Sequence, residues 1–98
     1  MEKTKHEIAN DYVYKATMAL AEAITEDINE LAKDNKEVVI NTCYSAYGID
    51  IVEVWLGSIK DNKVYFTSEF GVEHELDDMP IEKLIDINNA LLCGNYHY

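Results

Sequence analysis

Carboxylate side chains are the most frequent groups in this sequence that could do chemistry, and they gather in two stretches. The denser stretch lies in the C-terminal third of the chain and is interrupted only by Lys83. Its acids are Glu69, Glu73, Glu75, Asp77, Asp78, Glu82 and Asp86. In the N-terminal part, Glu22, Glu26 and Glu30 repeat every four residues, which stacks them on one face of a helix. Paired carboxylates can serve as general acid and base, but with this many acids no particular pair is indicated.

The histidines and cysteines do not indicate a metal site. Side chains alternate along a strand, so His74 should face away from the glutamates on either side of it. Cys93 and His97 have a ligand-like spacing, but a structural zinc site needs four ligands and the sequence offers no second pair. The segment 77–80 lacks the alternating carboxylates and the glycine of a calcium loop. We therefore expect neither a metal nor a cofactor.

Covalent catalysis is not indicated either. The serines do not stand in the glycine-flanked turn of a hydrolase nucleophile, and neither Cys43 nor Cys93 has a local base. Glycine is too scarce for a phosphate-binding loop. We expect no catalytic residues and a protein that is not an enzyme. Both cysteines lie in apolar segments and are interpreted as reduced core thiols of a cytoplasmic protein.

The charge of the chain excludes some classes of partner. Nineteen acids stand against eight lysines and no arginine, which gives a formal net charge of -11 on 98 residues. Direct binding of nucleic acid needs clustered Lys and Arg, so it is not expected. No apolar run approaches the ~20 residues that span a bilayer, and no apolar segment of a signal peptide follows the first lysines. These observations favour a cytoplasmic protein without membrane contact.

The elements that position these groups follow from the spacing of apolar residues. A helix is predicted over residues 4–33, because apolar side chains recur every four residues without Gly or Pro. Thr4 and Glu7 have the spacing of a capping box at its start, and Asn35 suits its stop. A second helix begins near Pro80 and stops at Gly94.

Between these helices the pattern is that of strands. We predict strands over residues 38–44, 49–59, 64–68 and 72–76, joined by short connections that imply an antiparallel meander. The tail 95–98 looks too short to form an element. The prediction is a single α+β domain of residues 1–98, with a long N-terminal helix, a four-stranded antiparallel meander and a C-terminal helix.

The length of the first helix raises the question of self-association. Thirty helical residues span about 45 Å, whereas a compact chain of this size is about 33 Å across. Either the first turns project with Ile8, Tyr12 and Val13 exposed, and a homodimer forms through them, or the helix breaks near Asn10 or Thr17 and buries that stripe.

One face of the sheet is a second candidate surface. Val52, Val54 and Leu56 share one face of the long strand and are interpreted as core. The other face carries Ile51 and Trp55, and with Tyr65 it forms a partly aromatic surface suited to a protein interface. If one helix covers each face, these residues are instead ordinary core.

The function that fits best is a small acidic interaction module that binds a basic protein partner, with the carboxylates steering it and the aromatics anchoring it. A narrower hypothesis is a nucleic-acid-mimicking inhibitor, since two acidic rows on one surface could approach the charge spacing of DNA. In composition alone, the chain is similar to small acidic inhibitors of nucleic-acid enzymes, of the phage or mobile-element type, such as phage anti-restriction and anti-CRISPR proteins. The alternative is a small self-associating assembly protein whose acidity serves solubility and protects strand edges.

Overall fold

The first helix, α1, spans Lys5–Leu31 in the computed structural model, which describes residues 2–34 and 37–98. The predicted N-cap at Thr4 is present, because the Thr4 hydroxyl accepts a hydrogen bond from the Glu7 N–H at 3.1 Å; it also donates to the Glu7 carboxylate at 3.2 Å, in place of the reciprocal backbone bond of a full capping box. The helix ends where the Ala32 N–H donates to the Ile28 carbonyl at 2.8 Å. The expected stop at Asn35 lies outside the described residues.

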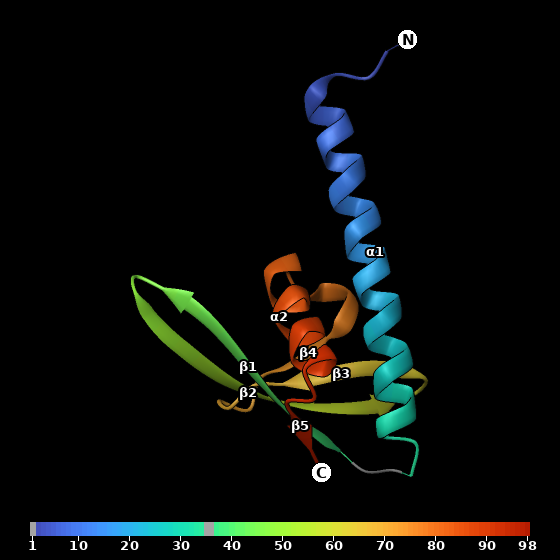
Figure 1. The fold of residues 1–98 in the computed structure, drawn as a ribbon. Helices are drawn as coiled ribbons and strands as arrows, with labels where there is room; N and C mark the ends of the chain where they lie inside the picture. The colour runs from blue at the N-terminus through green and yellow to red at the C-terminus, as the bar shows by residue number, and fades with distance from the viewer. Residues whose placement is uncertain (1, 35–36) are drawn as a thin grey trace.

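The first half of α1 projects from the domain (Figure 1). Within this helix the buried side chains are Ile24 and Ile28, both in its second half. Ile8, Tyr12 and Val13 are 42%, 71% and 51% exposed. The alternative of a break near Asn10 or Thr17 is therefore wrong. The projection also accounts for a radius of gyration of 14.9 Å, against about 12.6 Å for a compact chain of this length.

The described residues form five strands in one antiparallel sheet. In chain order they are β1 Val38–Ala46, β2 Ile49–Lys60, β3 Lys63–Thr67, β4 Glu73–Glu75 and β5 Tyr96–His97. Their order across the sheet is β4-β3-β2-β1-β5, which confirms the meander and adds a strand to it. Two-residue turns with positive φ join β1 to β2 and β2 to β3, and such turns match the twist of paired strands.

The extra strand comes from the tail that looked too short to form an element. After α2 (Ile81–Leu92) the chain reverses at Gly94, whose φ is 75°. The Asn95 N–H then donates to the Ala90 carbonyl at 2.8 Å, and the Asn41 N–H donates to the Asn95 carbonyl at 2.9 Å. This turn delivers the tail to the free edge of β1, where pairing rather than local propensity makes it a strand.

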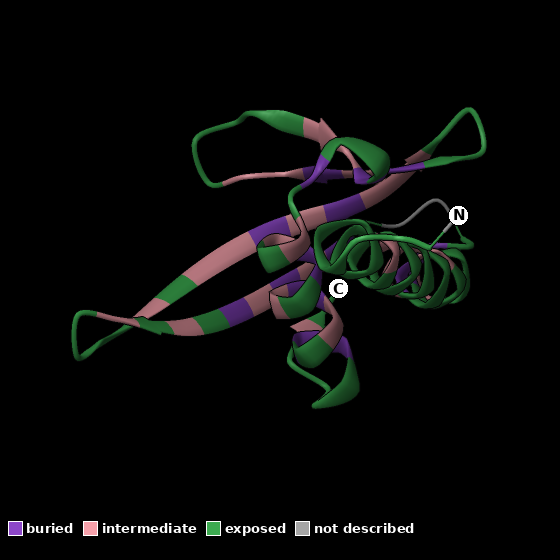
Figure 2. Cartoon of the chain, turned by 90° about the horizontal axis from the view of Figure 1, so that it is seen from above, coloured by how far each residue is buried: buried purple, intermediate pink, exposed green. Residues whose placement is uncertain are grey.

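α1 and α2 cover the same face of the sheet. In Figure 2, which looks along α1, both helices lie near the middle of the sheet, where the buried segments of the strands are found. A short 3-10 helix, η1 (Leu76–Asp78), leads from β4 toward α2. The buried apolar side chains form one cluster between the helices and the sheet. They are Ile24, Ile28, Ala32, Val38, Ile40, Trp55, Val64, Phe66, Leu76, Met79, Leu84, Ile87, Ala90 and Leu91.

The predicted assignment of the two sheet faces is wrong. Trp55 is 5% exposed and belongs to the core, because it pairs with Ile40 of β1 on the face that the helices cover. Tyr65 pairs with Ser58 and lies on the opposite face. Ile51, Trp55 and Tyr65 therefore do not form one surface. The uncovered face carries Val52, Val54 and Leu56, which had been assigned to the core, together with Val39, Cys43 and Tyr65.

Candidate protein-interaction surface

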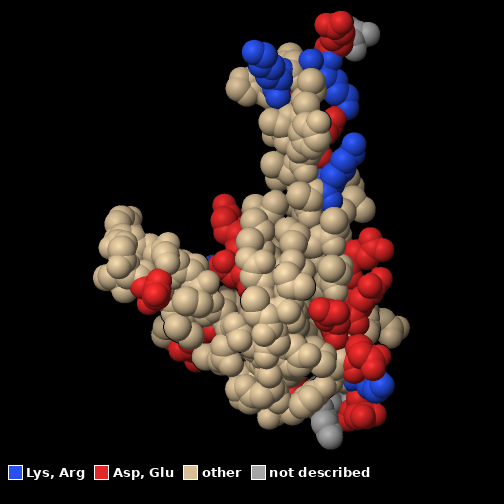
Figure 3. All heavy atoms as spheres, in the orientation of Figure 1, with Lys and Arg blue, Asp and Glu red and all other residues tan. Residues whose placement is uncertain are grey.

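The acids of α1 lie on its solvent side but do not form a straight row. Glu22, Glu26 and Glu30 are all exposed, yet residues four apart are turned by about 40° around a helix. Glu30 pairs with Lys33 at 2.9 Å, and this hydrogen bond raises the pKa of Lys33. Glu22 and Glu26 have no ion pair with any described residue. Acidic side chains gather over the second half of α1 and lysines over its first half (Figure 3).

The acids of β4 are largely neutralised by lysines. The Glu73 carboxylate lies 2.5 Å from Lys60 Nζ, and the Glu75 carboxylate lies 3.4 Å from Lys63 Nζ. The hydrogen bond to Glu73 raises the pKa of Lys60. Such exposed pairs contribute about 0 to 1 kcal/mol. The strand edge expected to be an acidic patch therefore presents alternating charges and is a poor docking surface for a basic partner.

Glu69 has a structural role at the edge of β2. Its carboxylate accepts a hydrogen bond from the Val54 N–H at 2.9 Å. β3 pairs with β2 only from Leu56 onward, so the edge of β2 at Val54 would otherwise be open. An unpaired strand edge is a template for adding foreign strands, and the Glu69 side chain covers part of it.

A groove between α1 and η1 brings the two acidic stretches together. This groove of about 120 Å³ has Thr25 on one wall and Lys63, Glu75 and Asp77 among the residues on the other, with Lys63 paired to Glu75. Glu22 stands three residues before Thr25 and so shares its side of α1, while Asp78 follows Asp77 and is also exposed. Glu22, Asp77 and Asp78 lack an ion pair with the described residues. We call these three residues the acidic groove surface.

A separate charged cluster lies between α2 and the β1–β2 hairpin. Lys83 Nζ lies 2.5 Å from the Glu53 carboxylate and 4.7 Å from the centre of the Tyr44 ring. Burial lowers the pKa of Lys83, but the bond to Glu53 outweighs it and leaves that pKa raised. Burial raises the pKa of Asp86, and Lys83 only partly offsets this. Asp86 belongs to this cluster rather than to the acidic groove surface, while Glu82 is exposed on the first turn of α2.

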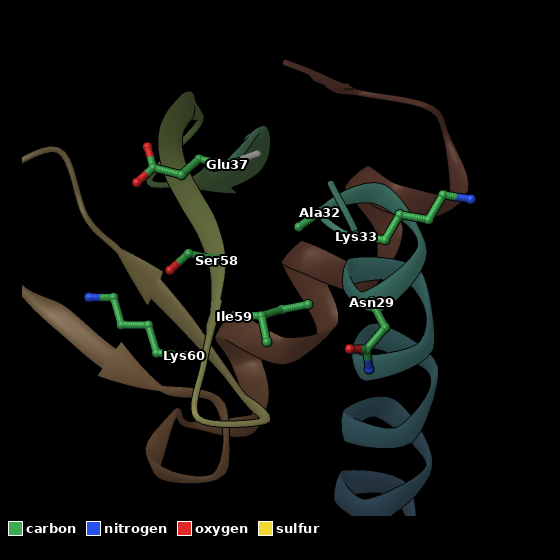
Figure 4. A pocket seen from close by; sticks show the side chains of 7 residues that line it. All are labelled: Asn29, Ala32, Lys33, Glu37, Ser58, Ile59 and Lys60. Carbon is green, nitrogen blue, oxygen red and sulfur yellow. The ribbon is translucent and has the colours of Figure 1, made fainter. Parts of the chain in front are cut away.

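A hollow of about 370 Å³ at the C-terminal end of α1 has polar walls but no convergent set of groups. Figure 4 shows Ile59 pointing toward α1, whereas Glu37 and Lys60 point away from it and Lys33 points away from the strands. Lys33 and Lys60 are each paired with an acid. Catalysis needs groups that converge on one reacting atom, and the side chains lining this hollow diverge.

The tip of the β1–β2 hairpin is an exposed apolar surface that was not predicted from the sequence. The hairpin extends away from the helices (Figure 1), with Tyr47 fully exposed and Ile49 and Val52 largely exposed. The two strands are nine and twelve residues long, longer than β3 and β4 that accompany them. That difference in predicted length was the available signal that the hairpin would extend beyond the sheet.

The cysteines were expected in the core, and this prediction is wrong. Cys43 and Cys93 are both free and exposed. Cys43 lies on the uncovered face of the sheet opposite Val52, and Cys93 caps the end of α2.

Among the described residues, no group of three or more His, Cys, Asp or Glu side chains is placed to hold a metal ion. Nor does this part of the chain contain a helix with the length and apolar character needed to cross a bilayer.

Comparison with protein-family models, with curated proteins and with solved structures gives no significant match. What the chain does is therefore inferred from its own fold and surface.

Proposed function

We propose that this chain is a non-enzymatic protein-interaction module whose acidic groove surface binds a basic protein partner. One observation carries the proposal. Glu22, Asp77 and Asp78 are exposed carboxylates from two distant parts of the chain, and none of them forms an ion pair with a described residue. Asp77 lines the groove, Glu22 and Asp78 stand near residues that line it, and the groove's own Lys63 is already paired with Glu75. Like charges held close together destabilise the isolated chain. A cationic partner would relieve that repulsion.

The charge of the whole domain supports the same proposal. Residues 21–98 hold sixteen acids and five lysines, a net of -11, whereas residues 1–20 hold three of each and are neutral. A field of one sign speeds the encounter with an oppositely charged protein, and the effect weakens as salt is added. The Debye length of about 8 Å at physiological salt leaves short-range attraction between the groove and a basic side chain intact.

The narrower version is a cytoplasmic inhibitor that occupies the nucleic-acid-binding groove of its partner. Such a groove presents lysines and arginines spaced for phosphates, and carboxylates on two walls could engage two rows of them. The exposed free thiols of Cys43 and Cys93 are compatible with a reducing compartment. In this version, duplex DNA competes with the chain for the partner and does not bind the chain itself.

The test is affinity capture from a lysate of the native host at low and moderate salt, followed by mass spectrometry. We expect a basic nucleic-acid-binding protein that is retained at low salt and lost at higher salt. The triple variant Glu22→Lys, Asp77→Lys and Asp78→Lys should no longer retain it. The matched control is Glu2→Lys, Glu37→Lys and Asp50→Lys, which changes the net charge equally at exposed sites away from the groove.

The control separates a docking surface from general acidity. Retention by the control variant and loss by the groove variant would support docking through the groove. Equal loss by both variants would mean that only the net charge matters. Full retention by the groove variant would reject the proposal and favour the assembly protein whose acidity serves solubility.

A further inference from the structure

We propose that α1 pairs antiparallel with α1 of a second copy of this chain, burying the arm that projects from each domain. The arm is the first sixteen residues of α1, 5–20, and is about 24 Å long. It carries Ile8, Tyr12 and Val13, which are exposed to solvent in the single chain. The proposal does not depend on the acidic groove surface, because none of Glu22, Asp77 and Asp78 is among the residues proposed to pair.

A stripe suited to such pairing runs along the exposed side of α1. Its members recur at intervals of three or four residues, the spacing that keeps side chains on one side of a helix. They are Lys5, Ile8, Tyr12, Ala16, Ala19, Ala23 and Glu26, and all are exposed. We call this set the α1 seam. It begins with a cation, continues with two large apolar residues and then three alanines, and ends with an acid.

This order is complementary to itself when one helix is reversed. If the two-fold axis passes between residues 15 and 16, Tyr12 lies opposite Ala19 of the partner subunit and Ile8 lies opposite its Ala23. Large side chains then meet small ones, so the helices can approach closely. At each end of the overlap Lys5 lies opposite the partner's Glu26. Parallel pairing would instead place Tyr12 against Tyr12 and Glu26 against Glu26.

The distribution of charge favours the same orientation. The neutral arm of one copy would lie along the acidic second half of the partner's α1, where Figure 3 shows acids gathered. Any arrangement that overlaps the two second halves would bring two strongly acidic domains together. The antiparallel pair keeps the two domains at opposite ends of the helices, which limits their repulsion.

The second half of α1 has room for the partner's arm. Ile24 and Ile28 face the core, whereas Ala19, Ala23 and Glu26 are exposed on another side of the same turns. Seen along α1 in Figure 2, the helix has exposed surface on the side away from the strands. The partner's arm can therefore lie on α1 without displacing a contact of the core.

The first test is the mass in solution by sedimentation equilibrium. We expect twice the monomer mass of 11.2 kDa. Tyr12→Glu should weaken association at least about 30-fold, as for a central aromatic of an interface. The matched control is Tyr14→Glu, because Tyr14 is also exposed but points about 200° away around the helix; its dimer should be unaffected. A monomer at every concentration, or equal weakening by both variants, would overturn the proposal.

Charge exchange tests the register. Lys5→Glu and Glu26→Lys should each weaken the dimer, about 5- to 30-fold for the two pairs broken in each case. The double variant restores opposite charges across the interface and should regain most of the affinity. Additive weakening in the double variant would overturn the Lys5–Glu26 pairing.

Disulfide trapping tests the orientation in a Cys43→Ser, Cys93→Ser background, which removes the exposed native thiols. Ala16→Cys lies next to the axis and should cross-link to itself. Ala23→Cys should remain uncross-linked alone and should cross-link when mixed with Ile8→Cys. Self-cross-linking of Ala23→Cys would indicate parallel helices and overturn the proposal.

Discussion

Ile28 of α1 packs against the backbone of β2 at Gly57. A Cβ atom at Gly57 would stand 3.3 Å from Ile28 Cδ1, 3.1 Å from Val38 Cγ1 and 3.2 Å from Phe66 Cε1. All three distances are shorter than ordinary van der Waals contacts between carbon atoms. The absence of a side chain at this position is what lets the helix lie on the sheet.

Substitution of Gly57 should therefore destabilise the protein. We expect Gly57→Ala to lower the free energy of unfolding by about 1 to 3 kcal/mol, because the neighbours must shift to admit a methyl group. Gly57→Val should cost more. Urea denaturation followed by circular dichroism measures both, and unchanged midpoints would show that the core accommodates the added atoms.

Two isoleucines on the same helix should differ sharply in their contribution to stability. Ile24 is fully buried, whereas Ile8 is 42% exposed on the arm. Ile24→Ala should lower the free energy of unfolding by about 2 to 5 kcal/mol. Ile8→Ala should change it by less than about 0.5 kcal/mol in the monomer. The comparison is made in the Tyr12→Glu background, so that association does not contribute. A large effect of Ile8→Ala there would mean that the arm packs on its own domain.

Tyr47 should be an unfavourable residue for the stability of its own turn. Its φ is 54° and its side chain is fully exposed, and the left-handed region costs a residue with a Cβ about 1 to 2 kcal/mol. Asn tolerates that region and precedes Gly in the preferred two-residue turn. Tyr47→Asn should therefore raise the thermal midpoint, and Tyr47→Phe, which keeps the backbone cost, should not. A lower midpoint for Tyr47→Asn would show that the tyrosine ring stabilises the fold.

Asp86 should make stability depend on pH in a predictable direction. Burial raises its pKa in the folded protein above the usual 3.8. The folded state thus holds the proton more tightly than the unfolded state, so the favourable contribution of Asp86 is complete below pH 3.8 and is lost as the pH rises through the folded pKa. Asp86→Asn should stabilise the protein at neutral pH, with a gain that shrinks as acid is added. A gain of the same size at every pH would contradict this cause.

Much of the fold could be predicted because its signals are local. The apolar period of residues 8–28 defines α1, the Thr4–Glu7 pair begins it, and Gly94 ends α2. The short connections after Ala46 and Lys60 define the meander. Each of these features depends on residues within a few positions of one another. The tail strand β5 was missed for the opposite reason, since it exists only by pairing with Val39 and Ile40.

The sheet faces and the acidic groove surface were harder to predict. β2 is apolar on both faces, so alternation alone could not tell which face is buried. The two-residue turn at Asp61–Asn62 carried the missing information, because it places Gly57 opposite Phe66 and hence Trp55 on the core face. The pairing of Lys60 with Glu73 joins residues thirteen positions apart. Which carboxylates lack an ion pair depends on such long-range contacts, and these contacts cannot be predicted from the spacing of residues in the sequence.

α1 is attached to its domain near one end only, so a small tilt at the attachment produces a larger displacement at the free end. Within the described helix its buried anchors are Ile24 and Ile28, with Leu20, Ala21 and Leu31 packed beside them, so the attachment is confined to the C-terminal part of α1. The arm extends about 24 Å from this part. A hydrogen-bonded helix is stiff over that distance, so a tilt of about 10° at the anchor would carry the tip through about 4 Å. Small changes in how Ile28 sits on Gly57 would thus be magnified at Ile8 and Tyr12.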